Sequence, residues 1–317
     1  MWIVKHRKWF FLLSLLFVAF SVYSIFTYGF NFSIDFKGGT ITEVRYVGEY
    51  PDKESVEESI QELALGGFSV RPSEGDSYII RTRELSGEES ALLLETLPLD
   101  QETSPVVERS NTVGPIAGAE LKSKAVKAVT VVVLMIVLFI TFAFRKVSKD
   151  CLPRPTSSSV ERAGRGVSSW KYGLATVVAL VHDVLIPTGI FVFLGHYLGL
   201  EVDLLFVSGL LAILGYSVHD TIVVFDRVRE NLSVNQTRHN TENFEETVGR
   251  SVTQTMGRSI NTSLTLLITL AALYFLGSSA THDFSLLLII GVIAGTYSSI
   301  FLASPLLVTF YKLQKNR

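Results

Sequence analysis

The chain has 317 residues, of which 48% are hydrophobic and 18% are charged, and its formal net charge at pH 7 is −2. A soluble globular domain carries about 25% charged residues, so the deficit points to membrane-spanning segments, and the near-neutral charge argues against a nucleic-acid partner. The single cysteine, Cys151, excludes an intrachain disulfide and a cysteine-based metal cluster, and the six histidines form no metal-ligand pattern backed by a third ligand. We expect neither a cofactor nor a metal.

The first predicted element is a membrane span. Trp9 to Tyr28 carries no charge, and about 20 apolar residues cross a bilayer. The run is too long for the core of a signal peptide, and no small-x-small cleavage site follows it. Residues 1–28 are therefore expected to form a short cytoplasmic N-terminus and a retained first span.

Residues 29–124 follow as an acidic segment, with 18 Asp and Glu against 9 Lys and Arg. Hydrophobic periodicity predicts strands and helices in the order β-α-β-β-α-β, which is typical of a ferredoxin-like fold with two helices on one face of a small antiparallel sheet. The predicted strands are 40–47, 68–72, 77–83 and 106–113, and the predicted helices are 53–65 and 87–97.

A Gly-Gly pair stands between the first span and the first strand. Gly38 and Gly39 follow Asp35 and Phe36, and paired glycines here predict a tight turn that starts the strand. A phosphate-binding loop does not fit, because no helix start follows and no P-loop lysine is present. We assign these four residues a structural role.

Five more apolar runs predict further spans, so the fold class is a polytopic α-helical membrane protein with six transmembrane helices and one exported α+β domain. The further spans are predicted at 125–145, 171–195, 203–226, 259–277 and 284–311. Residues 146–170, rich in Pro, Ser, Gly and Arg, predict a flexible linker. In the last span, Gly291 and Gly295 have the spacing of closely packed helices, which is a structural role.

Two of these spans contain a carboxyl group, Asp183 and Asp220. Inserting an Asp at the centre of a span costs roughly 2.5–3.5 kcal/mol, so each is a candidate functional residue. At about 1.5 Å per residue, both lie near the middle third of the bilayer. A polar layer is expected to line one interior seam, and its members are Asp183, Asp220, His182, His219, Thr296 and Ser298.

Such a carboxyl has two interpretations. Desolvation favours its neutral form, so it could take up a proton from one side and release it to the other. Alternatively, it ties helices together by hydrogen bonds alone. We favour proton relay for Asp220 and leave both interpretations open for Asp183. The candidate relay residues are Asp220, Asp183, His219 and Arg258, the last on the resemblance described below; His182 we interpret as a hydrogen-bonded neighbour.

Residues 227–258 are expected to form a cytoplasmic loop with an amphipathic helix. Phe244, Val248, Val252 and Met256 lie on one helical face, and Asn243 with Glu246 makes a plausible cap. This face either rests on the membrane or on a partner, or packs against the ends of the spans.

Lysine and arginine set the orientation, because they accumulate in cytoplasmic loops. The loops 196–203 and 278–283 contain neither residue, whereas both termini, the 146–170 linker and the segment after the fourth span do. Both termini, including the tail at 312–317, are therefore predicted to be cytoplasmic and residues 29–124 to be exported. No nucleophile–base arrangement or dinucleotide fingerprint is present, so we expect no enzyme and an energy source other than ATP.

Six motifs together resemble one family, SecF, a subunit of the bacterial SecDF protein-export machine. They are SIDFKGGT at 33–40, VGPIAGAELKSKAVKAV at 113–129, ALVHDVLIPTG at 179–189, GYSVHDTIVVFDRVREN at 215–231, RSINTSLTLL at 258–267 and GTYSSIFLASPLL at 295–307. Their order and spacing cover nearly the whole chain. The chain departs from the family pattern in three places. His219 stands where Asn is usual, Ser33 stands where Gly is common, and the linker at 146–170 is longer than usual.

The resemblance implies a member of the resistance-nodulation-division superfamily in the bacterial inner membrane. It implies pairing with SecD and work with the SecYEG channel and the SecA motor, with YajC and YidC as further candidate partners. The complex would use the proton-motive force to draw preproteins across the membrane. Asp220 would be the family's proton-carrying residue, and Arg258 would match a functionally important arginine.

Two other classes of protein stay open at this stage. A small-molecule exporter of the same superfamily normally carries twelve spans and two large external domains, which this chain lacks. A purely structural scaffold for the translocon would make the intramembrane acids dispensable. The coupling ion, proton or sodium, is not determined by the sequence.

Overall fold

In a computed structural model of the chain, the elements group into two compact units, each described here by itself. The helical unit comprises 1–30, 129–200 and 205–317, and the α+β unit comprises 31–128 and 201–204. The structure describes residues 2–47, 50–63, 65–73, 75–97, 105–143, 169–238 and 242–315. The predicted linker at 146–170 lies outside the described residues, except for its last two, which begin helix α8.

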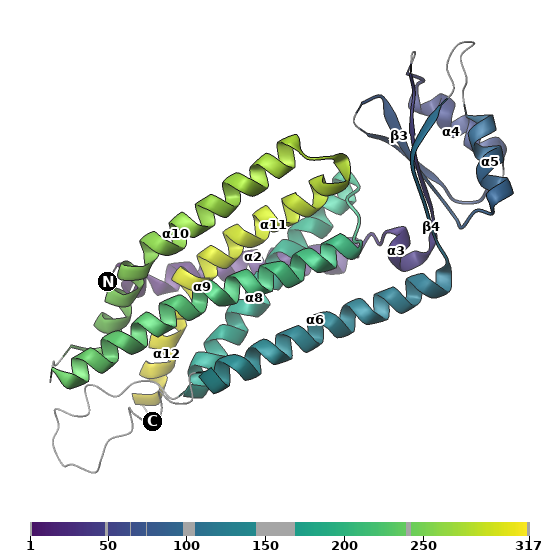
Figure 1. The fold of residues 1–317 in the computed structure, drawn as a ribbon. Coiled ribbons are helices and arrows are strands. Elements are labelled where there is room, and N and C mark those ends of the chain that lie inside the picture. Colours follow the sequence, from purple (N-terminus) through teal and green to yellow (C-terminus); the bar gives the residue numbers. More distant parts are fainter. Residues whose placement is uncertain are drawn as a thin grey trace. The chain divides into compact units, whose positions relative to one another are not determined.

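Within the described residues, six helices are long and apolar enough to cross a membrane, which confirms the predicted six-span fold class (Figure 1). The helices of this part of the chain are α1 (Trp2–Lys5), α2 (Arg7–Tyr28), α6 (Pro115–Ala143), α8 (Ser169–Leu198), α9 (Leu204–Thr237), α10 (Phe244–Leu276), α11 (Ser279–Tyr297), η1 (Ser298–Ala303) and α12 (Ser304–Lys315). The last span is continuous from α11 through η1 to α12, and η1 is a turn of π-helix that the sequence pattern did not predict.

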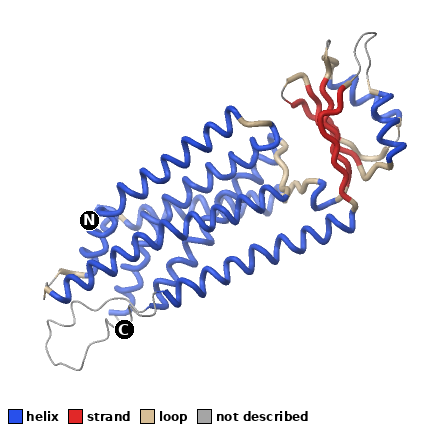
Figure 2. The backbone as a smooth tube through the Cα atoms, in the orientation of Figure 1, coloured by secondary structure: helices blue, strands red, loops and turns tan. Residues whose placement is uncertain are grey.

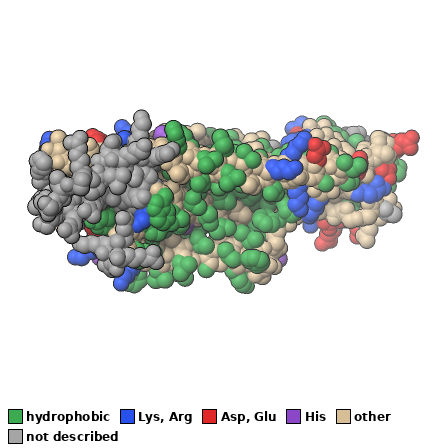
Figure 3. Space-filling view, turned by 90° about the horizontal axis from the view of Figure 1, so that it is seen from below, with side chains coloured by type: hydrophobic (Ala, Val, Ile, Leu, Met, Phe, Trp, Pro, Cys, Tyr) green, Lys and Arg blue, Asp and Glu red, His purple; other side chains and the backbone are tan. Residues whose placement is uncertain are grey.

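The outer surface of the helical unit is apolar. Large hydrophobic side chains stand exposed along the helices, among them Leu15 (63%), Leu138 (64%) and Phe275 (78%). Figure 3 shows hydrophobic side chains covering much of the visible face of this unit. A soluble monomer rarely exposes so large an apolar surface, whereas lipid is a suitable solvent for it.

The amphipathic segment after the fourth span is the first half of helix α10, which continues as the fifth span without a break. Phe244, Val248 and Val252 are buried in a core that also contains Val4 and Leu307. The sequence left open whether this face rests on the membrane or a partner, or packs against the ends of the spans. In the structure, it packs against the chain's own helices.

The two ends of the chain meet at the start of α10. Glu245 forms a salt bridge with Arg7 at 3.2 Å and a second one with Lys312 at 2.5 Å. One carboxylate thus joins the beginning of α2 to the end of α12, and both described ends of the chain lie together at one end of the helical unit (Figure 1).

The α+β unit has the predicted β-α-β-β-α-β order. Its elements are α3 (Ile34–Lys37), β1 (Gly39–Arg45), α4 (Lys53–Glu62), β2 (Ser69–Ser73), β3 (Ser77–Thr82), α5 (Gly87–Thr96) and β4 (Val106–Val113). The sheet order is β2-β3-β1-β4 with every neighbouring pair antiparallel. Both longer helices cover one face (Figure 2), where Val56, Ile60 and Leu93 pack against Val44 and Ile80.

Helix α5 begins with a capping box. The Ser86 side chain accepts from the amide of Glu89, and the Glu89 carboxylate accepts from the amide of Ser86. Arg83 donates to the same carboxylate, and these bonds lower the pKa of Glu89 to about 2. The cap fixes the point at which the chain leaves β3 and starts its second helix.

The Gly-Gly pair lies where the chain turns into β1. Gly38 has φ +79 and Gly39 has φ +138, a region that side chains disfavour. A Cβ on Gly38 would lie 2.8 Å from the Pro115 Cα atom, and one on Gly39 would lie 2.6 Å from the Thr82 carbonyl oxygen. The pair therefore lets the turn contact the first residue of α6 directly.

The short segment between α8 and α9 is held in the α+β unit. The Val202 amide donates to the Asn31 carbonyl at 2.8 Å, and the Ser33 amide donates to the Val202 carbonyl at 3.0 Å. Glu201 forms a salt bridge with Arg81 at 3.1 Å. Burial raises the pKa of Glu201, an effect that the nearby arginines oppose. The Asp35 carboxylate accepts from the amide of Leu204, the first residue of α9.

The packing of α10 gives a first prediction. Val248→Ala should lower the free energy of unfolding by about 2 kcal/mol, because two buried methyl groups lose their contacts. Thr253→Ala is the matched control on the exposed side of the same helix. Thermal unfolding of the isolated chain in mild detergent measures both. Equal stability of the two variants would mean that this face of α10 does not pack against the chain's own core.

Candidate functional site

Asp183 is fully enclosed within the helical unit, with 0% of its surface exposed. Its carboxylate accepts hydrogen bonds from His182 Nδ1 at 2.8 Å, from Ser298 Oγ at 2.6 Å and from Ser217 Oγ. These donors come from α8, η1 and α9. The carboxyl group therefore joins three elements and has donors on both oxygens, which offsets the cost of burying it.

Asp220 has a different environment. It lies on α9 with 6% of its surface exposed, and its Oδ1 atom accepts from Ser259 Oγ on α10 at 2.6 Å. Its Oδ2 atom is buried and makes no hydrogen bond of ordinary geometry with the described groups, although the Ser299 hydroxyl of η1 also interacts with the carboxylate. Asp220 is therefore held by fewer hydrogen bonds than Asp183.

A second polar cluster continues from Ser259 along α10. The Ser263 hydroxyl donates to the Ser259 carbonyl and lies 2.6 Å from both the Tyr216 hydroxyl and the Thr296 hydroxyl. Side chains of α9, α10 and α11 therefore meet one turn beyond Asp220. The predicted layer residue Thr296 belongs to this cluster.

The π-helical turn brings the two carboxyl environments together. Ser298 and Ser299 are both fully buried; Ser298 binds Asp183, and Ser299 lies 2.9 Å from the Thr221 hydroxyl, next to Asp220 in the chain. An α-helix turns about 100° between consecutive side chains, and the wider π-turn allows both serines to face α8 and α9. Hydroxyl groups thus occupy the space between Asp183 and Asp220.

Small residues allow the helices to approach at this depth. A Cβ on Gly291 would lie 2.2 Å from the Ile213 Cδ1 atom, and one on Gly295 would lie 3.2 Å from the Ser217 Cβ atom. Both glycines are on α11 and both contacts are on α9. The close approach of these helices places Ser217 within reach of Asp183.

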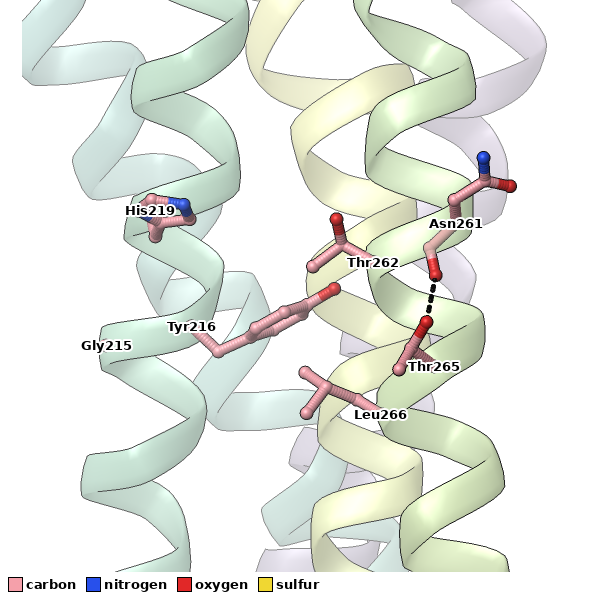
Figure 4. Close-up of a pocket in the computed structure, with 7 residues that line it drawn as sticks. All are labelled: Gly215, Tyr216, His219, Asn261, Thr262, Thr265 and Leu266. Atoms are coloured by element: carbon pink, nitrogen blue, oxygen red, sulfur yellow. Dashed lines mark hydrogen bonds between the residues drawn. The ribbon is translucent and has the colours of Figure 1, made fainter.

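His219 is not buried with the carboxyls, although it interacts electrostatically with its neighbour Asp220. It is exposed and lines an open groove of ≈ 650 Å³ between α9 and α10, together with Tyr216 and Asn261 (Figure 4). The expected polar layer is therefore wrong for this residue, because adjacent residues on a helix point about 100° apart. His182, in contrast, is buried and bonded to Asp183.

Arg258 is also exposed, in a second and more polar cavity of ≈ 300 Å³. Its other lining residues come from α9 and α10: Val223, Asp226, Arg227, Glu230, Gln254 and Thr255. Arg258 directly precedes Ser259, the hydrogen-bond partner of Asp220. The four relay candidates thus separate into two buried acids, Asp183 and Asp220, and two exposed side chains, His219 and Arg258.

Ser217 and Ser259 contact the two acids but were not singled out from the sequence. Ser217 lies three residues before Asp220, a spacing that places both on one side of α9, and this was a usable signal. For Ser259 the sequence carried no such signal, since it lies 39 residues from Asp220. Among the described residues, no three His, Cys, Asp or Glu side chains cluster to hold a metal ion.

Comparisons with known proteins agree on one family. A family model described as the C-terminal part of the protein export membrane protein SecD/SecF matches residues 168–313, and the SecD/SecF GG motif matches residues 23–47. The protein translocase subunit SecF of Thermobaculum terrenum is 37% identical over 97% of this chain and 93% of its own length. That of Sebaldella termitidis is 35% identical over 99% of this chain and 92% of its own.

A solved structure is similar over the whole fold. The crystal structure of SecDF from Thermus thermophilus, described as a translocon-associated membrane protein, matches with a TM-score of 0.79 and 31% sequence identity. The match covers 99% of this chain but 38% of the SecDF chain. The chain therefore spans less than half of that longer protein.

The unequal bonding of the two acids gives a second prediction. Asp183→Ala should destabilise the protein by about 1–3 kcal/mol more than Asp220→Ala, because it removes the acceptor of three buried donors rather than one. Thermal unfolding in detergent compares the two variants, which delete the same atoms. If Asp220→Ala is the more damaging change, the hydrogen bonds described here do not account for the stability of this region.

Proposed function

The chain belongs to the SecF family of protein translocase subunits, and from this premise we propose that it couples proton movement through its helical unit to preprotein export. Its direct partner is a SecD subunit, and the pair assists the SecYEG channel and the SecA motor. The argument for SecD comes from the share of the SecDF chain that this chain matches. The SecDF chain of Thermus thermophilus is a single polypeptide of which this chain matches 38%, so a separate subunit would supply the remainder.

The observation that carries the proposal is the environment of Asp220. Its carboxyl is buried in an apolar span, one oxygen accepts from Ser259, the Ser299 hydroxyl interacts with the group, and the other oxygen makes no hydrogen bond of ordinary geometry. Asp183 is held more firmly, with donors on both oxygens. Asp220 can therefore bind and release a proton without dismantling the contacts between α9 and α10, and we assign it the carrier role.

The other candidates take supporting roles in this proposal. Asp183, held by His182, Ser217 and Ser298, keeps α8, α9 and η1 in register. Arg258 lines the polar cavity that lies next to Ser259 along α10, and we assign it a role at that cavity. His219 lines the open groove and lies close enough to Asp220 to interact with its carboxylate electrostatically.

The orientation follows from the basic residues. Both chain ends carry Lys or Arg, and Arg227 and Arg229 follow the apolar part of α9, so these ends face the cytoplasm. The α+β unit is then extracytoplasmic, on the side where preproteins emerge. The protein is thereby assigned to the bacterial cytoplasmic membrane, and its exported unit is free to contact a translocating chain.

Cysteine labelling tests the orientation. In a Cys151→Ser background, Ser55→Cys on α4 and Gln236→Cys on α9 are both exposed positions. A membrane-impermeant maleimide added to intact spheroplasts should label Ser55→Cys only, and added to inverted vesicles should label Gln236→Cys only. Labelling of both positions from the same side contradicts the proposed orientation.

Asp220→Asn tests the carrier role. The amide keeps the shape of the side chain and an acceptor for Ser259 but cannot titrate. In inverted vesicles that contain SecD, we expect the variant to lose most of the stimulation of translocation by an imposed proton gradient, while ATP-driven translocation continues. Asp220→Glu should retain part of the stimulation, since a carboxyl group remains at a different reach.

Asp283→Asn in the first turns of α11 is the matched control, since it removes a half-exposed carboxylate at the end of the last span rather than a buried one. It should respond to the gradient as the wild type does. If Asp220→Asn also responds normally, Asp220 is a structural residue, and the scaffold interpretation replaces proton coupling.

A further inference from the structure

The last span contains one widened turn. Helices α11 and α12 are regular on either side of it, and between them η1 has the i→i+5 hydrogen bonding of a π-helix. Such a turn holds one more residue than an α-helical turn, is rare, and is found frequently at functional sites. This one contains Ser298 and Ser299, which contact Asp183 and Thr221.

The helices on both sides of the turn are held by packing. Before it, Gly295 of α11 lies so close to α9 that an added Cβ would be 3.2 Å from the Ser217 Cβ atom. After it, Tyr311 of α12 stacks on Phe244 of α10, with ring centroids 4.6 Å apart. Since neither helix is free to rotate, the extra residue must be accommodated between them.

A proline follows the turn directly. Pro305 has no amide hydrogen, so the Phe301 carbonyl lacks the donor that a regular α-helix would give it. A proline alone is insufficient, because α8 runs through Pro187 as an uninterrupted α-helix. The two prolines differ in the residue that precedes them, which is Ile186 in α8 and Ser304 in the last span.

The Ser304 side chain matches the widened turn. It is fully buried, and its hydroxyl donates to the Ser299 carbonyl, five residues earlier, at 3.1 Å. Other hydroxyls in the spans commonly donate to the carbonyl four residues earlier, as those of Thr269 and Thr309 do. The hydrogen bond of Ser304 therefore fits the spacing of a π-helical turn and not that of an α-helical one.

The place of the turn decides which side chains face the two acids. Ser298 donates to Asp183 at 2.6 Å, while Ser299 lies 2.9 Å from Thr221 and interacts with Asp220. Consecutive side chains of an α-helix point about 100° apart. If the widened turn formed elsewhere in the span, these serines would rotate away from their partners.

We propose that Ser304 is a positioning residue whose hydroxyl fixes the widened turn at 298–303. By fixing the turn, it directs Ser298 and Ser299 to the two acids. Its action is indirect, because it contacts the Ser299 backbone rather than either carboxyl group. The consequence for export rests on the proposed function, whereas the fixing of the turn does not.

Hydrogen–deuterium exchange of the complete chain in mild detergent tests whether Ser304 fixes the turn. Ser304→Ala removes the hydroxyl without adding bulk. Backbone amides at 298–304 should then exchange on the order of fivefold faster, the factor that corresponds to the net contribution of one hydrogen bond.

Thr309→Ala is the matched control, because its hydroxyl belongs to the same helix but donates to the carbonyl four residues earlier. It should leave the exchange at 298–304 unchanged. Equal exchange of this segment in the two variants overturns the proposal.

Translocation into inverted vesicles that contain SecD tests the positioning role. Ser304→Ala should lose most of the stimulation by an imposed proton gradient, while ATP-driven translocation continues and the thermal stability stays close to that of Thr309→Ala. Thr309→Ala should keep the full stimulation.

Deletion of Ala303, the smallest side chain of the turn, is a second variant. It removes the extra residue, so a continuous α-helix can form without a change in the register of α11 or α12. The deletion should lose the stimulation as well. Full stimulation in the deletion variant means that the widened turn is not required and overturns the positioning role.

The outcomes separate this inference from the proposed function. Full stimulation in Ser304→Ala, with loss of stimulation in Asp220→Asn, overturns the positioning role and leaves proton coupling in place. Normal stimulation in Asp220→Asn overturns the proposed function and the role of Ser304 in export with it. The exchange measurement decides in either case whether Ser304 fixes the turn.

Discussion

A carboxylate enclosed by apolar helices must be surrounded by hydrogen-bond donors, and Asp183 imposes this constraint on the helical unit. Its donors come from α8, α9 and η1, so these elements must approach one another at a single depth. The glycines of α11 make the approach sterically possible, and the π-helical turn directs two consecutive serines inward. The close packing, the π-helical turn and the hydroxyl donors of this region thus all surround one buried carboxyl group, whose burial would be costly without them.

Asp220 lies next to the helices that the contacts around Asp183 hold together. Its neighbours are held in place by the contacts around Asp183, yet its own second oxygen makes no hydrogen bond of ordinary geometry with the described groups. A group that must change its protonation state cannot be fully committed to donors, because each donor favours the charged form. The two acids therefore differ in how many hydrogen bonds hold them, and the proposed carrier role of Asp220 rests on this difference.

The α+β unit is continuous with the spans through short segments whose conformation is fixed by specific contacts. The Gly-Gly turn contacts Pro115 at the start of α6, and the 201–204 segment pairs with the chain that leaves α2. Asp35 of the Gly-Gly motif binds the amide of Leu204, where α9 begins. The helix that carries Asp220 therefore starts at a residue held by this motif.

The sequence by itself determined the six spans, the β-α-β-β-α-β order and the two intramembrane acids, because these depend on local hydrophobicity, periodicity and the rarity of charge in lipid. It could not decide whether α10 packs on its own chain or on a partner, since an apolar face is the same in both cases. Nor could it separate His219 from Asp220, or connect Ser259 to that acid across 39 residues. Only the tertiary structure decided these points, because hydrogen-bond partners distant in the chain are chosen by helix packing, register and a π-turn that local propensity does not encode.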